Sequence, residues 1–100
     1  MAEEEQPDIA WVGIACSAYL ALSAQITDVG LSKQLFARDA KWWFSIAKGF
    51  FGEAEGAEAL EVLMKAQQVK YNNGELSWDE MLDASQQCST VKLKIESMLE

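Results

Sequence analysis

The run of residues 9–27 is the feature that most restricts how this chain can fold. It reads IAWVGIACSAYLALSAQIT, 19 residues without a charged side chain, which is long enough for a helix to cross a bilayer. However, ten of these residues are Gly, Ala, Ser, Cys or Thr, and Asp8 and Asp28 flank the run where membrane spans carry lysine or arginine. The chain also begins MAEEE, without the basic start of a signal peptide. We therefore interpret the run as a buried helix of a soluble protein.

This first helix is predicted to extend over residues 8–26, because Pro7 and Asp8 suit a helix start. Gly13, Ser17 and Ala21 recur every four residues and form a narrow stripe of small side chains, where another helix can approach closely. Since apolar or small residues surround the whole helix, we expect it to be the central and most buried element of a helical bundle.

A second helix is predicted over residues 31–51, with a basic stripe opposite an aromatic face. The stripe contains Gln34, Arg38, Lys41, Ser45 and Lys48, and the apolar face contains Leu35, Phe36, Trp42, Trp43, Ile46 and Phe50. Asp39 interrupts the apolar face, and an unpaired buried carboxylate is unfavourable. We expect either a structural hydrogen bond, to an indole N–H or to a hydroxyl of the 8–26 helix, or a place at the rim of a binding face.

Three glycines in residues 49–56 predict a break, after which a third helix covers residues 53–71. Phe50 and Phe51 are adjacent, so both cannot face one direction on a helix, and we expect at least one to be partly exposed. The alternative is that each packs against a different neighbour.

The fourth helix is predicted to begin at Trp78, because Ser77 and Glu80 fit a capping box. A buried seam is expected along this helix at Met81, Ala84, Cys88, Val91, Ile95 and Met98. Weak helix formers at residues 85–90 leave open a kink or a division into two helices. The predicted fold is all-α, a compact four-helix bundle that forms a single domain over residues 1–100, with residues 1–7 as a flexible N-terminus.

Cys16 and Cys88 are the two cysteines, 72 positions apart. Both fall on apolar helical positions, and a secreted domain of this size would usually carry several disulfides. We expect two buried thiols in a reducing cytoplasm, and a structural disulfide is the alternative.

The composition argues against catalysis. The chain has no histidine, so it has no imidazole base and no histidine-based metal site. Phosphate-binding glycine motifs and calcium-binding loops are absent from the sequence. Asp79 and Asp83, four residues apart, are interpreted as a solvated helix surface rather than an acid–base pair. We expect no enzyme activity, no catalytic residues, no cofactor and no bound metal.

The charge is unevenly distributed along the chain. The net charge is −8, but residues 29–52 carry four basic residues and one acid, a net of +3, which leaves −11 for the rest. Three acidic blocks carry most of it: Glu3, Glu4, Glu5 and Asp8; Glu53, Glu55, Glu58 and Glu61; Glu75, Asp79, Glu80 and Asp83. This excess argues against direct binding of nucleic acid. Acidic blocks on a rigid scaffold can instead occupy a basic groove meant for nucleic acid, and ordinary solubility charge is the alternative.

In its length, its acidic blocks and its lack of a catalytic set, the whole chain resembles the small acidic helical proteins with which phages inhibit host defence, in particular anti-CRISPR proteins. That class shares no motif, so no site is transferred residue by residue. The resemblance implies a monomeric inhibitor in the bacterial host cytoplasm, without a membrane, which docks on basic surfaces of a Cas surveillance complex and blocks target-DNA binding. The expected partner-binding residues are Asp28, Asp39, Phe51, Glu53, Glu55, Glu58, Glu61, Glu75, Asp79, Glu80 and Asp83.

Two other functions remain open. The protein could be a dimeric helical adaptor, toxin antidote or secretion chaperone that uses the aromatic surface around Phe50 and Phe51. It could also be a small structural subunit of a larger assembly.

Overall fold

The computed structural model describes residues 8–99, and all four of its elements are helices. In chain order they are α1 (Asp8–Ile26), α2 (Gly30–Phe51), α3 (Glu53–Asn72) and α4 (Trp78–Leu99). The predicted all-α four-helix bundle is confirmed, and each predicted helix boundary is met within one residue. The expectation of a flexible N-terminus at residues 1–7 lies outside the described residues.

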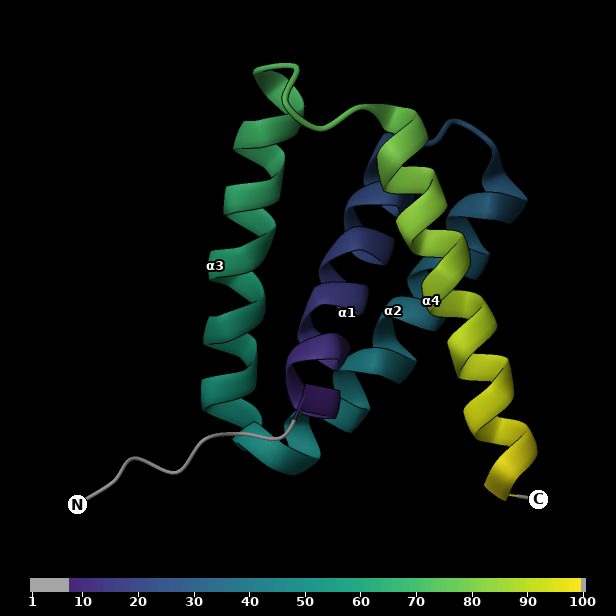
Figure 1. The fold of residues 1–100 in the computed structure, drawn as a ribbon. Helices are drawn as coiled ribbons and strands as arrows, with labels where there is room; N and C mark the ends of the chain where they lie inside the picture. Colours follow the sequence, from purple (N-terminus) through teal and green to yellow (C-terminus); the bar gives the residue numbers. More distant parts are fainter. Residues whose placement is uncertain (1–7, 100) are drawn as a thin grey trace.

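The central helix is α1, as predicted. It packs against all three other helices, with α2 behind it and with α3 and α4 on either side in the view of Figure 1. The turn at residues 73–77 carries the chain over the top from α3 to α4, which make almost no contact with each other. By length and composition α1 could span a membrane, but more than half of it is buried against the other helices, as in a core helix.

The stripe of small residues on α1 receives α2, as the sequence predicts. A Cβ atom added to Gly13 would lie 3.2 Å from the carbonyl oxygen of Trp43 and 3.3 Å from the Cβ of Ala47, so the two backbones are closely packed there. One turn later, Ser17 Oγ donates a hydrogen bond to the carbonyl oxygen of Ala40 at 2.9 Å. The small side chains of α1 therefore let the aromatic face of α2 pack closely against α1 in the core.

Trp43 fills the centre of that core and is fully buried. It belongs to one buried cluster with Cys16, Leu20, Ala40 and Cys88, which joins α1, α2 and α4. Its indole Nε1–H donates to the carbonyl oxygen of Cys88 at 3.2 Å, so its polar atom is satisfied inside the core.

Two of the three turns between the helices use a glycine with positive φ. Gly52 (φ +86°) separates α2 from α3, at the predicted break, and Gly74 (φ +80°) lies in the turn after α3. The predicted capping box is confirmed at the start of α4. The backbone N–H of Glu80 donates to Ser77 Oγ at 3.1 Å, and the N–H of Ser77 donates to Glu80 Oε1 at 3.0 Å.

The fourth helix is one continuous element from Trp78 to Leu99, which settles the open question of a division. The hydroxyls of Ser85, Ser89 and Thr90 are hydrogen-bonded within the fold. The predicted seam is right at Met81 and Cys88 but wrong at Val91, which is 39% exposed, and at Met98, which is 82% exposed. The buried face includes the polar residues Ser85 and Lys92, which a search for apolar seams passes over.

Candidate functional site

Asp39 lies in a buried cluster of polar residues between α2 and α4. Ser89 Oγ donates to its Oδ2 at 2.8 Å, and Lys92 Nζ is 3.1 Å from its Oδ1. The Arg38 Nε lies 3.4 Å from the same Oδ1, although the Arg38 side chain itself is mostly exposed. The predicted structural role is thus supported, but both main partners come from α4 rather than from an indole or from α1.

The environment of Asp39 keeps it charged. Burial by itself raises the pKa of this carboxyl group. The hydrogen bonds from Ser89 and Lys92, together with the positive charges of Lys92 and Arg38, outweigh burial and hold the pKa below its ordinary value of 3.8. Because the Asp39 carboxylate is buried and paired with Lys92 and Ser89, the structure favours the structural role over a place at the rim of a binding face.

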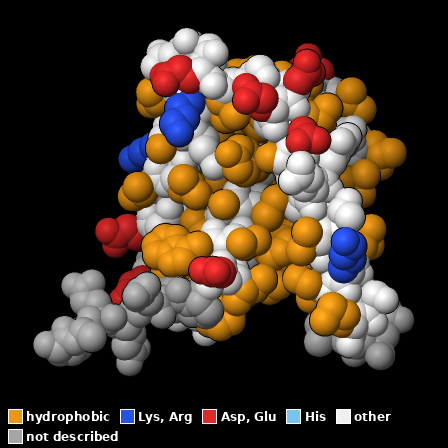
Figure 2. Space-filling view, in the orientation of Figure 1, with side chains coloured by type: hydrophobic (Ala, Val, Ile, Leu, Met, Phe, Trp, Pro, Cys, Tyr) orange, Lys and Arg blue, Asp and Glu red, His pale blue; other side chains and the backbone are white. Residues whose placement is uncertain are grey.

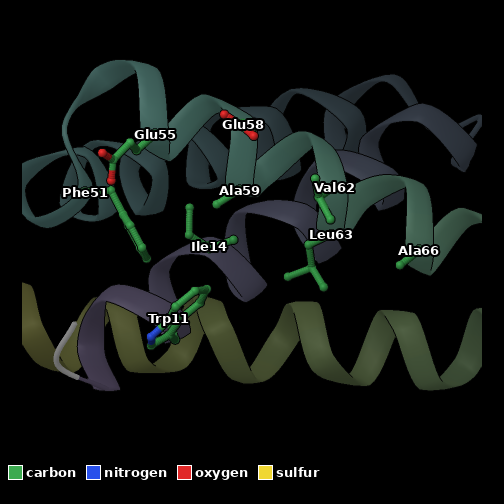
Figure 3. Close-up of a pocket in the computed structure, with 9 residues that line it drawn as sticks. All are labelled: Trp11, Ile14, Phe51, Glu55, Glu58, Ala59, Val62, Leu63 and Ala66. Carbon is green, nitrogen blue, oxygen red and sulfur yellow. The ribbon is translucent and has the colours of Figure 1, made fainter. Parts of the chain in front are cut away.

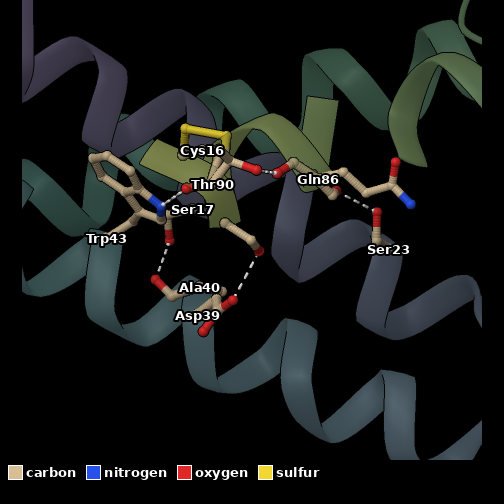
Figure 4. The surroundings of a disulfide bond; sticks show 11 residues. Cys16, Ser17, Ser23, Asp39, Ala40, Trp43, Gln86 and Thr90 are labelled. Atoms are coloured by element: carbon tan, nitrogen blue, oxygen red, sulfur yellow. Dashed lines mark hydrogen bonds between the residues drawn. A yellow bond between two sulfur atoms is a disulfide. The ribbon is translucent and has the colours of Figure 1, made fainter. Parts of the chain in front are cut away.

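Cys16 and Cys88 form a disulfide bond, which corrects the expectation of two free thiols. Their Cα atoms are 5.6 Å apart, and the bond ties α1 to α4 beside the hydrogen bonds of Ser17 and Trp43 (Figure 4). Disulfides persist in oxidising compartments and are reduced in most cytosols. In a reducing cytoplasm the same two side chains would be thiols.

The remaining predicted carboxylates lie on the surface. Of the ten predicted carboxylates, Asp39 is buried and the other nine are exposed. The exposed ones are Asp28, Glu53, Glu55, Glu58, Glu61, Glu75, Asp79, Glu80 and Asp83. Within the described part of the chain, the one salt bridge in this set joins Glu61 to Lys65 at 3.1 Å. Two others hold local positions, since Glu80 caps α4 and Asp83 accepts from Gln87. Most of these charges are therefore available to a partner.

Figure 2 shows how these charges are arranged on one face of the molecule. Acidic side chains lie along its upper edge and on its left side, around a centre that is mainly hydrophobic. Basic side chains lie at the upper left and at the lower right. The predicted basic stripe of α2 is also largely exposed, with Arg38 and Lys41 at the surface.

The hydrophobic centre includes a groove between α1 and α3, here named the α1/α3 groove. It has a volume of about 490 Å³, and Figure 3 labels the nine residues that line it. Trp11 and Phe51 meet edge to face at one end, with ring centroids 4.9 Å apart, and Val62 and Leu63 of α3 line the opposite wall. Glu55 and Glu58 belong to the same lining and place two carboxylates on the α3 side.

A second groove, the α1/α4 groove, lies on the other side of the same α1 surface. It has a volume of about 280 Å³ and is lined by Val12, Ala15 and Tyr19 of α1 and by Ala84 and Val91 of α4, among others. Trp11 is 53% exposed and Val12 is 41% exposed. Between the two grooves, Trp11 and Val12 therefore belong to a strip of α1 that no other helix covers.

The sequence anticipated only part of this surface. Phe51 was predicted as a contact residue and lines the α1/α3 groove, and Phe50 is 44% exposed, which confirms that one of the pair is partly exposed. Trp11 was missed, because an apolar helix that packs on three others was expected to be covered on all sides. The one signal in the sequence is the acidic Asp8, three residues before Trp11, which could have indicated that the first turns of this helix are exposed to solvent.

No group of three or more Cys, Asp, Glu or His side chains within residues 8–99 is arranged to hold a metal ion. A scan against protein-family models found no match for the chain, and neither did searches of curated proteins and of solved structures.

Proposed function

We propose that this protein is a binding protein that recognises a basic surface on a protein partner and blocks access of nucleic acid to it. One observation supports the proposal above the others: the carboxylates of α3 and of the turn into α4 are exposed and mostly without an ion-pair partner in the described structure. They stand on helices fixed to one core, so their spacing is preserved when they meet a partner.

Such a surface is suited to competition with nucleic acid. A groove that binds DNA or RNA carries lysine and arginine side chains, and a rigid array of carboxylates is attracted by the same field. Charge complementarity of this kind accelerates encounter and makes binding sensitive to salt. Without a catalytic step, the protein would act in stoichiometric amounts.

The resemblance in size and acidity to anti-CRISPR proteins supports a narrower form of the proposal, in which the partner is a Cas surveillance complex in a bacterial cytoplasm. In that compartment Cys16 and Cys88 would be reduced. The narrower form therefore requires that the reduced protein inhibit target-DNA binding by a purified surveillance complex, measured by a filter-binding or gel-shift assay. Loss of inhibition upon reduction would contradict it.

The general proposal is tested with two forms of the protein as bait. The wild type and a charge-reversed variant, with Lys at Glu53, Glu55, Glu58 and Glu61, are incubated with bacterial lysate, and captured proteins are quantified by mass spectrometry. We expect the wild type to enrich basic nucleic-acid-binding proteins that double-stranded DNA releases, and the variant to lose them. Equal capture by both forms, with circular dichroism showing an intact fold, would overturn the proposal.

A second function is favoured by the position of Phe51, which contacts Trp11 at the end of the α1/α3 groove. An adaptor or chaperone would use these aromatic rings as its main contact. Replacing Phe51 with Ala while the acidic blocks remain intact should then remove binding. Charge reversal should have a small effect.

A further inference from the structure

We infer that the strip of α1 between α3 and α4 binds an amphipathic helix of the partner, whose apolar face enters the two grooves and whose Lys or Arg residues face Glu55 and Glu58. This inference rests on the proposed function, because it identifies the element of the basic partner that the protein recognises. It adds a site, a secondary structure and an orientation.

The bundle is open on the side of this strip. A closed four-helix bundle would bring α3 against α4, but these two helices scarcely touch and stand on either side of α1 (Figure 1). The exposed side chains in the opening are large and apolar: Trp11 on α1 and Val62 on α3, which is 64% exposed. Amphipathic helices bind in apolar grooves of this kind.

Two aromatic rings form an anchor in this opening. Trp11 and Phe51 come from different helices, and their edge-to-face contact fixes both rings at the open end of the α1/α3 groove. Tryptophan is among the residues that contribute most to binding once a partner covers it. Figure 3 shows both rings beside Ile14, which forms the buried floor.

Charge complementarity selects the occupant. Glu55 and Glu58 are exposed and line the α1/α3 groove, whereas the described residues that line the α1/α4 groove are all uncharged. The α3 side is therefore the acidic side, and a partner helix with its basic edge toward α3 satisfies it. The structure thus favours a basic amphipathic helix over an acidic or uncharged one.

A defined probe tests the inference. It is a fluorescein-labelled peptide of about 18 residues, long enough to form a helix, with leucines at positions i, i+3, i+4 and i+7 and lysines elsewhere. Its control is the same peptide with glutamate in place of lysine. Fluorescence anisotropy against the full-length protein should show binding of the lysine peptide and no binding of the glutamate peptide.

Two matched variants locate the site. Val62 and Leu93 are both 64% exposed, but Leu93 lies on α4 and lines neither groove. Val62→Glu should weaken binding of the lysine peptide about tenfold or more, as expected for a polar group in the centre of an interface. Leu93→Glu should leave the affinity unchanged. Because both positions are exposed, both variants should keep the circular dichroism spectrum and Tm of the wild type.

Two double variants test the orientation of the partner helix. Glu55→Lys with Glu58→Lys should weaken binding of the lysine peptide more than Glu75→Lys with Asp79→Lys does, although both pairs change the net charge equally. Equal effects of the two pairs, or of Val62→Glu and Leu93→Glu, would overturn the inference. A wild-type dimer by light scattering that Val62→Glu converts to a monomer would also overturn it, because a second copy would then be the occupant.

The outcomes separate this inference from the proposed function. If charge reversal along α3 abolishes capture of basic proteins but Val62→Glu does not, the proposed function stands and the groove inference fails. If Val62→Glu and the peptide assay behave as expected but the captured proteins are unrelated to nucleic acid, the groove inference stands and the proposed function fails.

Discussion

Cys16 of α1 and Cys88 of α4 are joined by a disulfide bond across 72 residues of chain. The bond lies where α4 has few other supports, since α4 packs on α1 and α2 and scarcely touches α3. It joins the central helix to the last one and so closes most of the fold into a single loop. The open strip of α1 described above therefore has one wall, α4, that is held by a covalent bond.

Removal of this bond should destabilise the protein. Closing a loop of this length restricts the unfolded chain by about 4 kcal/mol in the chain-entropy treatment of disulfides. We expect the double variant Cys16→Ala, Cys88→Ala, or the wild type in dithiothreitol, to show a lower midpoint in urea unfolding followed by circular dichroism. The double variant itself should not respond to dithiothreitol. An unchanged midpoint for the reduced wild type would contradict a role of the bond in stability.

The helices and their ends could be predicted because their signals are local. The capping box of Ser77 and Glu80 and the glycine at position 52 each act within a few residues, and both appear as predicted. The stripe that begins at Gly13 also predicted close packing correctly. In these cases the periodicity of one helix is sufficient to identify the buried face.

The contacts between helices could not be predicted, because they depend on which helices pack together in the fold. Ser89 and Lys92 pair with Asp39 across about 50 positions, and no local pattern assigns them to it. The disulfide has the same origin, because the partners of a cysteine depend on how the helices are placed. Most of the exposed carboxylates of the candidate site were predicted from the acidic blocks along the chain, whereas the exposure of Trp11 required knowing that α3 and α4 stand apart.

Asp39 should make the stability of the protein depend on pH. Its pKa is held below the ordinary value of 3.8 in the folded state, so folding favours the charged carboxylate. The stabilisation is complete above the ordinary pKa and is lost as the pH falls through the lower pKa of the folded state. In urea unfolding between pH 7 and pH 2, Asp39→Asn should therefore show a smaller loss of stability below about pH 4 than the wild type does.

At neutral pH, Asp39→Ala should be strongly destabilising. It leaves Lys92, which is also buried, with Glu96 at 3.8 Å as its remaining ion-pair partner. Breaking a buried pair from one side costs about 3 kcal/mol or more. The double variant Asp39→Ala, Lys92→Met should lose less than the sum of the two single variants, because it leaves no buried charge. Additive losses in this double-mutant cycle would show that the two side chains are not coupled.

Gly13 and Gly49 should respond to substitution in opposite directions. Gly13→Leu forces a side chain against the backbone of α2 and should destabilise the fold by about 1–3 kcal/mol. Gly49 lies within α2 with nothing within 4 Å of an added Cβ, so Gly49→Ala should stabilise it by about 0.5–1 kcal/mol. Thermal unfolding of both variants measures this difference. A loss of stability in Gly49→Ala would contradict the open environment that the structure gives it.

The start of α4 should depend on the hydroxyl of Ser77. Ser77→Ala removes the acceptor for the N–H of Glu80 and should cost about 1 kcal/mol in urea unfolding. Glu80→Gln is the matched control, because a glutamine oxygen can still accept from the N–H of Ser77 in a capping box. Its cost should be smaller, limited to the loss of a negative charge at the helix N-terminus, about 0.3–1 kcal/mol. Hydrogen exchange should show faster exchange confined to the first turn of α4 in Ser77→Ala, and an unchanged stability of Ser77→Ala would mean that the hydroxyl is not the cap.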